Sequence, residues 1–305
     1  MAGTRGRGRA GVPRGRGVKP FRYLRPASLD DAVAALRELG DGAQIIAGGQ
    51  SLLLAMKARQ ATPTSLVSLA GVTDLRGLHR DEGELVLGAT TTYADLERFT
   101  ADTGPALRWI RAVVSNIADT AVRSMATIGG AACQAEPAFD VPTLLTACDA
   151  TLTVVSAEGS RELAADGFFD RAGATQRRRD EVLRSIRIPC PKAARYGFAK
   201  FGLRAHDAAL ASVAVVVRAS DGVVEDARVV IGGCVERPTR AADSERWLQG
   251  QELSTAAPRF GAAVAEEVEP TISTTPFSSA YRRRLLAGLA RRALVQAADQ
   301  PDGVR

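Results

Sequence analysis

The segment Met125–Ala150, MATIGGAACQAEPAFDVPTLLTACDA, decides how the rest of the chain is interpreted. It contains a glycine pair, Gly129 and Gly130, after a short apolar run, and a second pair, Gly48 and Gly49, lies far upstream. Because glycine has no Cβ, a ligand can approach the main chain closely at such points. Main-chain N–H groups left unpaired where a helix begins bind phosphate oxygens. We therefore expect the two loops to hold the diphosphate of one cofactor.

Neither glycine pair identifies a cofactor by itself. A strand-to-helix turn containing glycine is common where no ligand binds. Neither sequence fits the dinucleotide fingerprint G-x-G-x-x-G or the phosphate loop G-x-x-x-x-G-K-[ST]. The case for a shared site therefore depends on the two loops together.

Length and composition indicate an ordinary globular protein. The chain has 305 residues, which suffices for two domains with substantial cores. No apolar run approaches the roughly 20 residues needed to span a bilayer, and the first residues lack the apolar core of a secretory signal. We expect a cytoplasmic location, with the inner face of the membrane as one option.

The net charge of +6 comes from 40 basic and 34 acidic residues. Six of the 40 basic residues lie in Met1–Lys19, which has no acid, so the rest of the chain balances at 34 of each sign. We expect this Gly/Arg-rich tail to be disordered. An RNA- or membrane-binding arm is the alternative, although no aromatic residue is interleaved to stack on a base. No nucleic-acid binding is expected for the folded body.

The cysteines give no metal-site pattern. Cys133, Cys148, Cys190 and Cys234 are widely spaced without a C-x-x-C pair, and the chain has only two histidines. We therefore expect no metal ion or iron–sulfur centre held by this chain, and interpret the cysteines as buried thiols in a reducing cytoplasm.

Local patterns divide the chain near Pro189 and Pro191. Before them, Ser28 caps a helix that Gly40 ends, and short strands alternate with helices. Strands are predicted at 43–47, 65–70, 84–87, 151–156, 161–164 and 183–189, with a helix or turn from Leu52 and helices from Thr92, Leu107 and Asp140. Beyond the prolines, strands are predicted at 196–203, 208–218 and 223–232, and helices at 239–250, 254–267 and 277–297.

Six segments, in order, resemble the FAD-binding medium subunits of molybdenum hydroxylases, the family of xanthine dehydrogenase and aerobic carbon monoxide dehydrogenase. They are FRYLRPASLDDAVAAL from Phe21, AGGQSLLLAMKAR from Ala47, VRSMATIGGAACQAEPAFDVPTLLTACDA from Val122, RYGFAKFGLRAHDAALASVAVVV from Arg195, ARVVIGGCVERPTRA from Ala227 and SSAYRRRLLAGLARRAL from Ser278. Six ordered matches make a chance resemblance far less credible than one loop would.

The resemblance implies an α+β fold. A two-subdomain FAD-binding domain of the PCMH type would precede a C-terminal three-stranded antiparallel sheet with a helical bundle. The expected parts are a tail at 1–19, the FAD-binding domain at 20–191 with subdomains at 20–71 and 72–191, a C-terminal domain at 192–298 and a tail at 299–305.

The resemblance also implies the cofactor-binding residues, and no catalytic residue. Asp140 would lie near the ribityl chain, and Ile188 and Lys200 near the flavin or the adenine. The alternatives are a plain helix N-cap for Asp140 and a solvent-facing position for Lys200. The first diphosphate loop would consist of Ala47, Gly48, Gly49, Gln50 and Ser51, and the second of Thr127, Ile128, Gly129, Gly130 and Ala131.

The chain departs from the family pattern beside the second loop. Ala131 replaces an asparagine, Gln134 and Glu136 replace the histidine and aspartate of H-A-D-P, and Ser124 and Met125 replace an asparagine and a basic residue. Main-chain donors survive these changes, whereas side-chain donors do not. We expect FAD to bind more weakly; the alternative is a flavin-free structural subunit.

The function implied by the resemblance is electron transfer. A large molybdopterin subunit would oxidise the substrate, a small subunit with iron–sulfur clusters would pass the electrons on, and FAD on this chain would deliver them to NAD, a quinone or oxygen. The family assembly is often a dimer of heterotrimers. The substrate would be selected by the large subunit.

Overall fold

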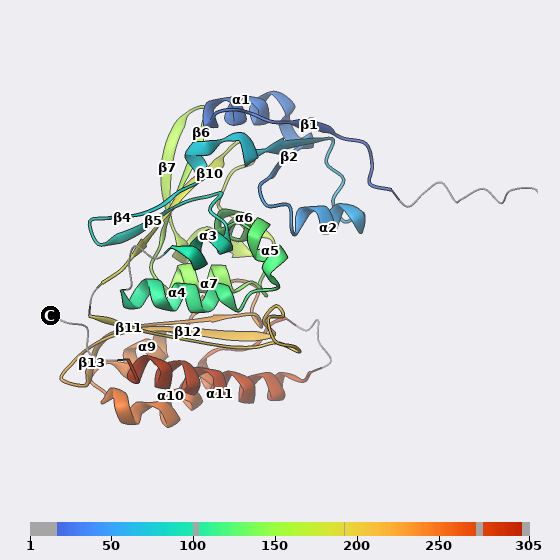
Figure 1. Ribbon diagram of the computed structural model, residues 1–305. Helices are drawn as coiled ribbons and strands as arrows, with labels where there is room; N and C mark the ends of the chain where they lie inside the picture. Colours follow the sequence, from blue (N-terminus) through green and yellow to red (C-terminus); the bar gives the residue numbers. More distant parts are fainter. Residues whose placement is uncertain (1–16, 100–103, 192, 273–276, 301–305) are drawn as a thin grey trace, which may run out of the picture.

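The computed structural model describes residues 17–99, 104–191, 193–272 and 277–300 (Figure 1). The expectations for the Arg/Gly tail fall almost entirely outside these residues, as do those for the last five. Among the described residues, three sheets of three or more strands follow one another along the molecule, and the last of them lies between two groups of helices (Figure 1). Among the described helices, none is both long and apolar enough to pass through a membrane.

The first sheet is small and parallel. Its strands β1 (Arg22–Leu24), β3 (Ser65–Ser68) and β2 (Ala43–Ile46) lie in that spatial order, with helices α1 (Leu29–Leu39) and α2 (Leu52–Lys57) between them in sequence. The predicted caps of α1 are confirmed, because Ser28 Oγ accepts a hydrogen bond from Asp31 N and Gly40 follows the helix with φ +58°. Short 3₁₀ turns occupy Gly40–Gly42, Leu69–Gly71 and Thr73–Leu75.

The second sheet has five antiparallel strands in the order β4-β5-β10-β6-β7. They are β4 (Leu78–Asp81), β5 (Glu84–Gly88), β10 (Val182–Pro189), β6 (Thr151–Ser156) and β7 (Gly159–Ala164). The sequence did not predict β4. Its residues LHRD lack an apolar alternation because it is a largely exposed edge strand.

Helices pack between this sheet and the third one. They are α3 (Tyr93–Arg98), α4 (Pro105–Ser115), α5 (Thr120–Met125), α6 (Ile128–Gln134) and α7 (Asp140–Ala147), followed later by α8 (Ala165–Phe168) and the hairpin β8 (Phe169–Arg171) and β9 (Ala174–Thr175). The start of α3 is a capping box, in which Asp95 N donates to Thr92 Oγ1 and Thr92 N donates to Asp95 Oδ2. All eight residues of α7 are buried.

The third sheet is antiparallel and belongs to the C-terminal part. Its strands are β11 (Ala194–Phe201), β12 (Ala211–Ser220), β13 (Val223–Gly232) and the two-residue β14 (Thr239–Arg240), which adds a fourth strand to the three expected. The helices are α9 (Ala242–Leu248), α10 (Leu253–Glu267) and α11 (Ser279–Ala298). The helix predicted from Thr239 therefore begins three residues later, because its first residues form β14.

The two faces of the third sheet contact different partners. Val213, Val215 and Val229 point into the core shared with α10 and α11, whereas Tyr196, Ala214 and Val230 join the core of the second sheet and its helices. Alternating residues of a strand point to opposite faces, so both faces are apolar because both are covered. Helix α7 contacts β12 and β13 on the second of these faces.

Candidate cofactor-binding site

Gly48 and Gly49 of the first glycine pair and Gly130 of the second border one cavity of about 480 Å³. This volume falls in the range of roughly 300–1,000 Å³ typical of small-molecule sites. Its walls come from the β2–α2 loop, the start of α6, the start of α7, and β11 with the loop that follows it. The predicted site residues that line it are Ala47, Gly48, Gly49, Gln50, Ser51, Thr127, Gly130, Ala131, Asp140 and Lys200.

The β2–α2 loop presents a run of main-chain donors. Within the described part of the chain, the N–H groups of Gly48, Gly49, Gln50 and Ser51 have no hydrogen-bond acceptor. Gly49 has φ +70°, a conformation that favours glycine, and its carbonyl accepts from Leu53 N at 3.0 Å as α2 begins. The loop therefore offers four N–H groups without an acceptor beside the cavity, a set suited to an anion.

The two glycine segments touch one another through main-chain atoms. A Cβ placed on Gly48 would lie 2.0 Å from Met125 O and 3.0 Å from Ala126 Cα. The segment Met125–Ala126 is fixed in turn, because Ala126 O accepts a hydrogen bond from Tyr93 N at 3.1 Å. Only glycine fits at position 48, and its absence of a side chain lets the loops meet.

The second glycine segment supplies donors differently from the first. Ile128 N donates to Thr91 O and Gly129 N donates to Ala89 O, both at 3.0 Å, and Gly130 N donates to Thr127 Oγ1 at 3.1 Å. The expectation that this segment leaves its N–H groups unpaired is therefore wrong for these three residues. Their hydrogen bonds fix the start of α6 on the adjoining strand and loop.

Ile128 and Gly129 are buried and do not line the cavity. A Cβ on Gly129 would lie 2.5 Å from Ala89 O, so this glycine is required for the close packing of α6 on the residues after β5. Ile188 is also fully buried, opposite Leu85 in the second sheet, and does not line the cavity. The structure does not bring these three predicted residues to the cavity wall.

Asp140 and Lys200 form an ion pair at the cavity. Lys200 Nζ lies 2.6 Å from Asp140 Oδ2 and donates to Asn116 O at 2.9 Å. The side chains are 3% and 14% exposed, so the solvent-facing alternative for Lys200 is wrong. The N-cap alternative for Asp140 is also wrong, because Phe139 is the N-cap and Asp140 is the first helical residue.

The second carboxylate oxygen of Asp140 takes no part in the contact with Lys200. Asp140 Oδ1 is buried and has no hydrogen-bond partner among the described residues. Burial raises the pKa of Asp140, and the Lys200 ammonium offsets part of that rise. A buried acceptor without a partner is costly, so a hydroxyl group donating to Oδ1 would be bound favourably.

Several lining residues were not predicted from the sequence. Tyr93 comes from the first turn of α3, Phe139 precedes α7, and His206 and Asp207 lie in the β11–β12 loop. Burial, and then the nearby Asp140 carboxylate, raise the pKa of the Tyr93 phenol. The helix predicted from Thr92 did place Tyr93 in a first turn, but no local signal aims that turn or the β11–β12 loop at the cavity.

The departures from the family pattern cluster at this cavity. Ala131 lies in its wall as a buried apolar residue, while Gln134 and Glu136 line it with exposed side chains. Met125, whose main chain meets Gly48, is 54% exposed. Met125 therefore adjoins the loop contact itself, whereas the other three line the cavity.

Comparisons with known proteins agree over nearly the whole chain. Residues 19–191 match the family "FAD binding domain in molybdopterin dehydrogenase", and residues 196–297 match "CO dehydrogenase flavoprotein C-terminal domain". The chain is 34% identical to the carbon monoxide dehydrogenase medium chain of Afipia carboxidovorans, covering 91% of this chain and 96% of that one. It is 27% identical to the xanthine dehydrogenase FAD-binding subunit of Escherichia coli O157:H7, covering 90% and 95%.

Solved structures give the same result. The reconstituted CO dehydrogenase from Oligotropha carboxidovorans matches with a TM-score of 0.88 at 33% identity, covering 93% of this chain and 99% of that one. Quinoline 2-oxidoreductase from Pseudomonas putida 86 matches with a TM-score of 0.84 at 30% identity, covering 92% and 98%. These matches support the FAD-binding interpretation over the flavin-free one.

The cavity fits this cofactor in its donors and acceptors. The main-chain N–H groups of Gly48–Ser51 suit a diphosphate, and the unpartnered Asp140 Oδ1 suits a hydroxyl. The matched relatives are subunits of dehydrogenases. The chain therefore belongs to the family of FAD-binding medium subunits of molybdenum hydroxylase complexes, and FAD is its cofactor.

Proposed function

We propose that this chain holds FAD as the electron-transfer group between the iron–sulfur clusters of a small subunit and an external acceptor. When bound, FAD supplies both one-electron and two-electron chemistry, which suits such a relay. The observation that carries the proposal is the convergence of the Gly48–Ser51 donors and the Asp140–Lys200 pair on one cavity. The chain's own residues bind and orient the cofactor.

The β2–α2 loop would hold the diphosphate. Its four residues, from Gly48 to Ser51, line the cavity, and the contact of Gly48 with Met125–Ala126 fixes the loop against the start of α6. Thr127 and Gly130 would complete the phosphate-binding wall from the other side. Hydrogen bonds from amides to a charged phosphate are stronger than those between neutral groups.

Asp140 would accept a hydrogen bond from a ribityl hydroxyl through Oδ1. The ion pair with Lys200 compensates the charge on Oδ2 and fixes the orientation of the carboxylate. Because Lys200 comes from β11 and Asp140 from α7, this contact requires the C-terminal sheet to be docked on the first domain. We assign no nucleophile and no general base to this chain.

The substitutions at the second loop would weaken FAD binding without abolishing it. Ala131 removes a side-chain amide, worth on the order of 1–3 kcal/mol for one or two hydrogen bonds. The main-chain donors of Gly48–Ser51 are unaffected by that change. We therefore propose a cofactor that dissociates more readily from this chain than from relatives with the asparagine.

The assembly we propose is a heterotrimer with a large molybdopterin subunit and a small iron–sulfur subunit, arranged as a dimer of heterotrimers. The relatives support the multi-subunit part, since their names include "medium chain", "medium subunit" and "complex subunit alpha". Mass determination of the co-expressed complex tests the doubled arrangement.

The central test is flavin content. The complex, co-expressed with its large and small subunits and purified, should contain flavin or take it up from added FAD to one per medium chain. Asp140→Asn should lower the affinity while leaving the complex assembled. A correctly assembled complex that shows no visible flavin absorbance, even with excess FAD, would refute the proposal.

A further inference from the structure

Helix α7 connects the cavity with the C-terminal sheet. Asp140, its first residue, lies at the cavity, and all eight residues of the helix are buried. On the sheet below, Lys200, Ser212 and Gly232 stand side by side on neighbouring strands. Lys200 reaches Asp140, and Gly232 lies against both Ser212 and Thr143, which is three residues further along α7.

The absence of a side chain at Gly232 allows α7 to lie this close to the sheet. A Cβ at this position would be 2.0 Å from Thr143 Oγ1, 2.8 Å from Ser212 Oγ and 3.2 Å from Thr143 Cβ. Gly232 does not have a positive φ, so its backbone would accept alanine. Glycine is therefore required here because there is no room for a Cβ under the helix, and not because of the backbone conformation.

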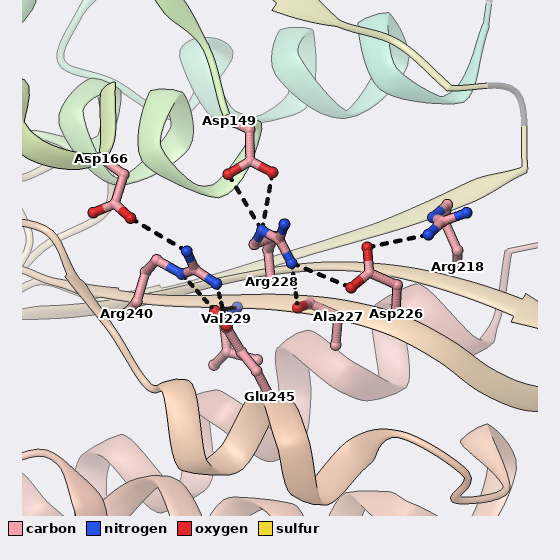
Figure 2. Close-up of polar contacts among 9 residues, drawn as sticks. All are labelled: Asp149, Asp166, Arg218, Asp226, Ala227, Arg228, Val229, Arg240 and Glu245. Atoms are coloured by element: carbon pink, nitrogen blue, oxygen red, sulfur yellow. Dashed lines mark hydrogen bonds and ion pairs between the residues drawn. The ribbon is translucent and has the colours of Figure 1, made fainter. Parts of the chain in front are cut away.

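The far end of α7 is held by a network of ion pairs (Figure 2). Both carboxylate oxygens of Asp149, two residues past the helix, accept from Arg228 Nε at 3.2 and 2.9 Å. Arg240, on the neighbouring strand β14, bridges Asp166 of the first domain and the buried Glu245 of the second. The helix is thus fixed to the sheet at both ends, and Thr143 and Gly232 make its close contact in between.

We propose that Gly232 is a positioning residue for the flavin site, acting through Thr143 and α7 on Asp140. An alanine would have to move Thr143 Oγ1 by about 1.4 Å to reach the 3.4 Å of ordinary contact. Asp140 is one turn away on the same short buried helix, so the carboxylate moves with it and away from the cofactor. The proposal rests on the role proposed above for Asp140.

The test is the dissociation constant of FAD, measured by fluorescence titration of the flavin-depleted complex. Gly232→Ala should raise it about tenfold or more, the equivalent of one hydrogen bond to a charged group. The matched control is Gly288→Ala in α11, where a Cβ would meet no atom within 4 Å. That control should bind FAD as the wild type does.

A graded series separates positioning from loss of folding. Adding Thr143→Ala to Gly232→Ala leaves the 2.8 Å contact with Ser212, and adding Ser212→Ala as well leaves only the 3.2 Å contact with Thr143 Cβ. The dissociation constant should fall step by step toward that of the Thr143→Ala/Ser212→Ala background. If Gly232→Ala alone does not fold, the comparison uses the variant with Thr143→Ala added and the variant with both Thr143→Ala and Ser212→Ala added.

A double-mutant cycle tests the route through Asp140. In an Asp140→Asn background, Gly232→Ala should change FAD affinity much less than in the wild type, because the contact it disturbs is already lost. Wild-type affinity in folded Gly232→Ala, or an equal loss in both backgrounds, would overturn the proposal. Neither result would alter the proposed function, which fails only if the wild-type complex binds no FAD.

Discussion

Replacing Gly48 by alanine tests the contact between the two glycine segments. The new Cβ would lie 2.0 Å from Met125 O, 2.8 Å from Met125 C and 3.0 Å from Ala126 Cα. All three are main-chain atoms, which no rotamer change can move aside. Separation to the 3.4 Å of ordinary contact requires the loops to part by about 1.4 Å.

The size of the effect follows from the donors on the moved loop. A hydrogen bond of about 2.9 Å that lengthens by this amount is no longer a hydrogen bond. Each bond to a charged acceptor contributes about 1.5–3 kcal/mol, so losing two of the donors from Gly48–Ser51 costs about 3–6 kcal/mol of binding. This corresponds to an increase of about 10²–10⁴-fold in the Kd of FAD.

The assay is titration of the flavin-depleted complex with FAD, with thermal unfolding measured in parallel. Overpacking also destabilises the fold by about 1–3 kcal/mol, so titrations belong well below the unfolding temperature. Gly130→Ala should be milder, since its nearest atom is the end of the Thr127 side chain at 2.7 Å. If folded Gly48→Ala binds FAD within threefold of wild type, the loops do not jointly hold the diphosphate.

Three further predictions concern single side chains. Lys200→Met leaves Asp140 buried without its cation and should lower the free energy of unfolding by about 3–5 kcal/mol at neutral pH. Because burial raises the pKa of Asp140, acidification protonates the carboxylate, and the loss measured by urea unfolding should shrink. An equal loss at pH 4 and 7 would contradict this. Ala131→Asn should tighten FAD binding about tenfold in the same titration, and no change would mean that the missing amide does not face the cofactor. Desolvation raises the pKa of Glu181, but its hydrogen bond with Arg161 and other contacts outweigh this and lower the pKa below 4.5. Glu181→Gln should therefore reduce the free energy of unfolding above that pH, and the reduction should vanish as pH falls through the folded pKa. A difference in unfolding free energy that does not depend on pH would count against this.

Local chemistry predicted much of the fold. The Ser28 cap and the Gly40 end of α1 depend on neighbours within a few residues, and the structure confirms both. Strand β4 was missed because an exposed edge strand needs no apolar alternation. The first residues of the helix predicted from Thr239 form a strand, because pairing with β13 overrides local preference.

The part of the site formed by the Gly48–Ser51 loop could be predicted from its local sequence. The parts that depend on contacts between residues far apart in the sequence were harder to predict. Pairing of Ile128 N with Thr91 O and Gly129 N with Ala89 O involves segments almost 40 residues apart, which no local pattern reveals. The same holds for Lys200, whose partner Asp140 lies in another domain. Ile188 was assigned by resemblance alone, and its alternating apolar neighbours fit the buried strand in which it lies.

The complete burial of α7 has a consequence for how the polypeptide matures. The helix is covered on one side by β12 and β13, which begin 64 and 76 residues after its last residue (211 − 147 and 223 − 147) and are therefore made later. Until then the side of α7 that faces these strands has nothing to cover it, and a fragment ending near Pro191 would keep that side exposed to solvent. A fragment cut after residue 191, where the match to the FAD-binding domain ends, should therefore aggregate. Co-expression of the remaining C-terminal part should keep it in solution.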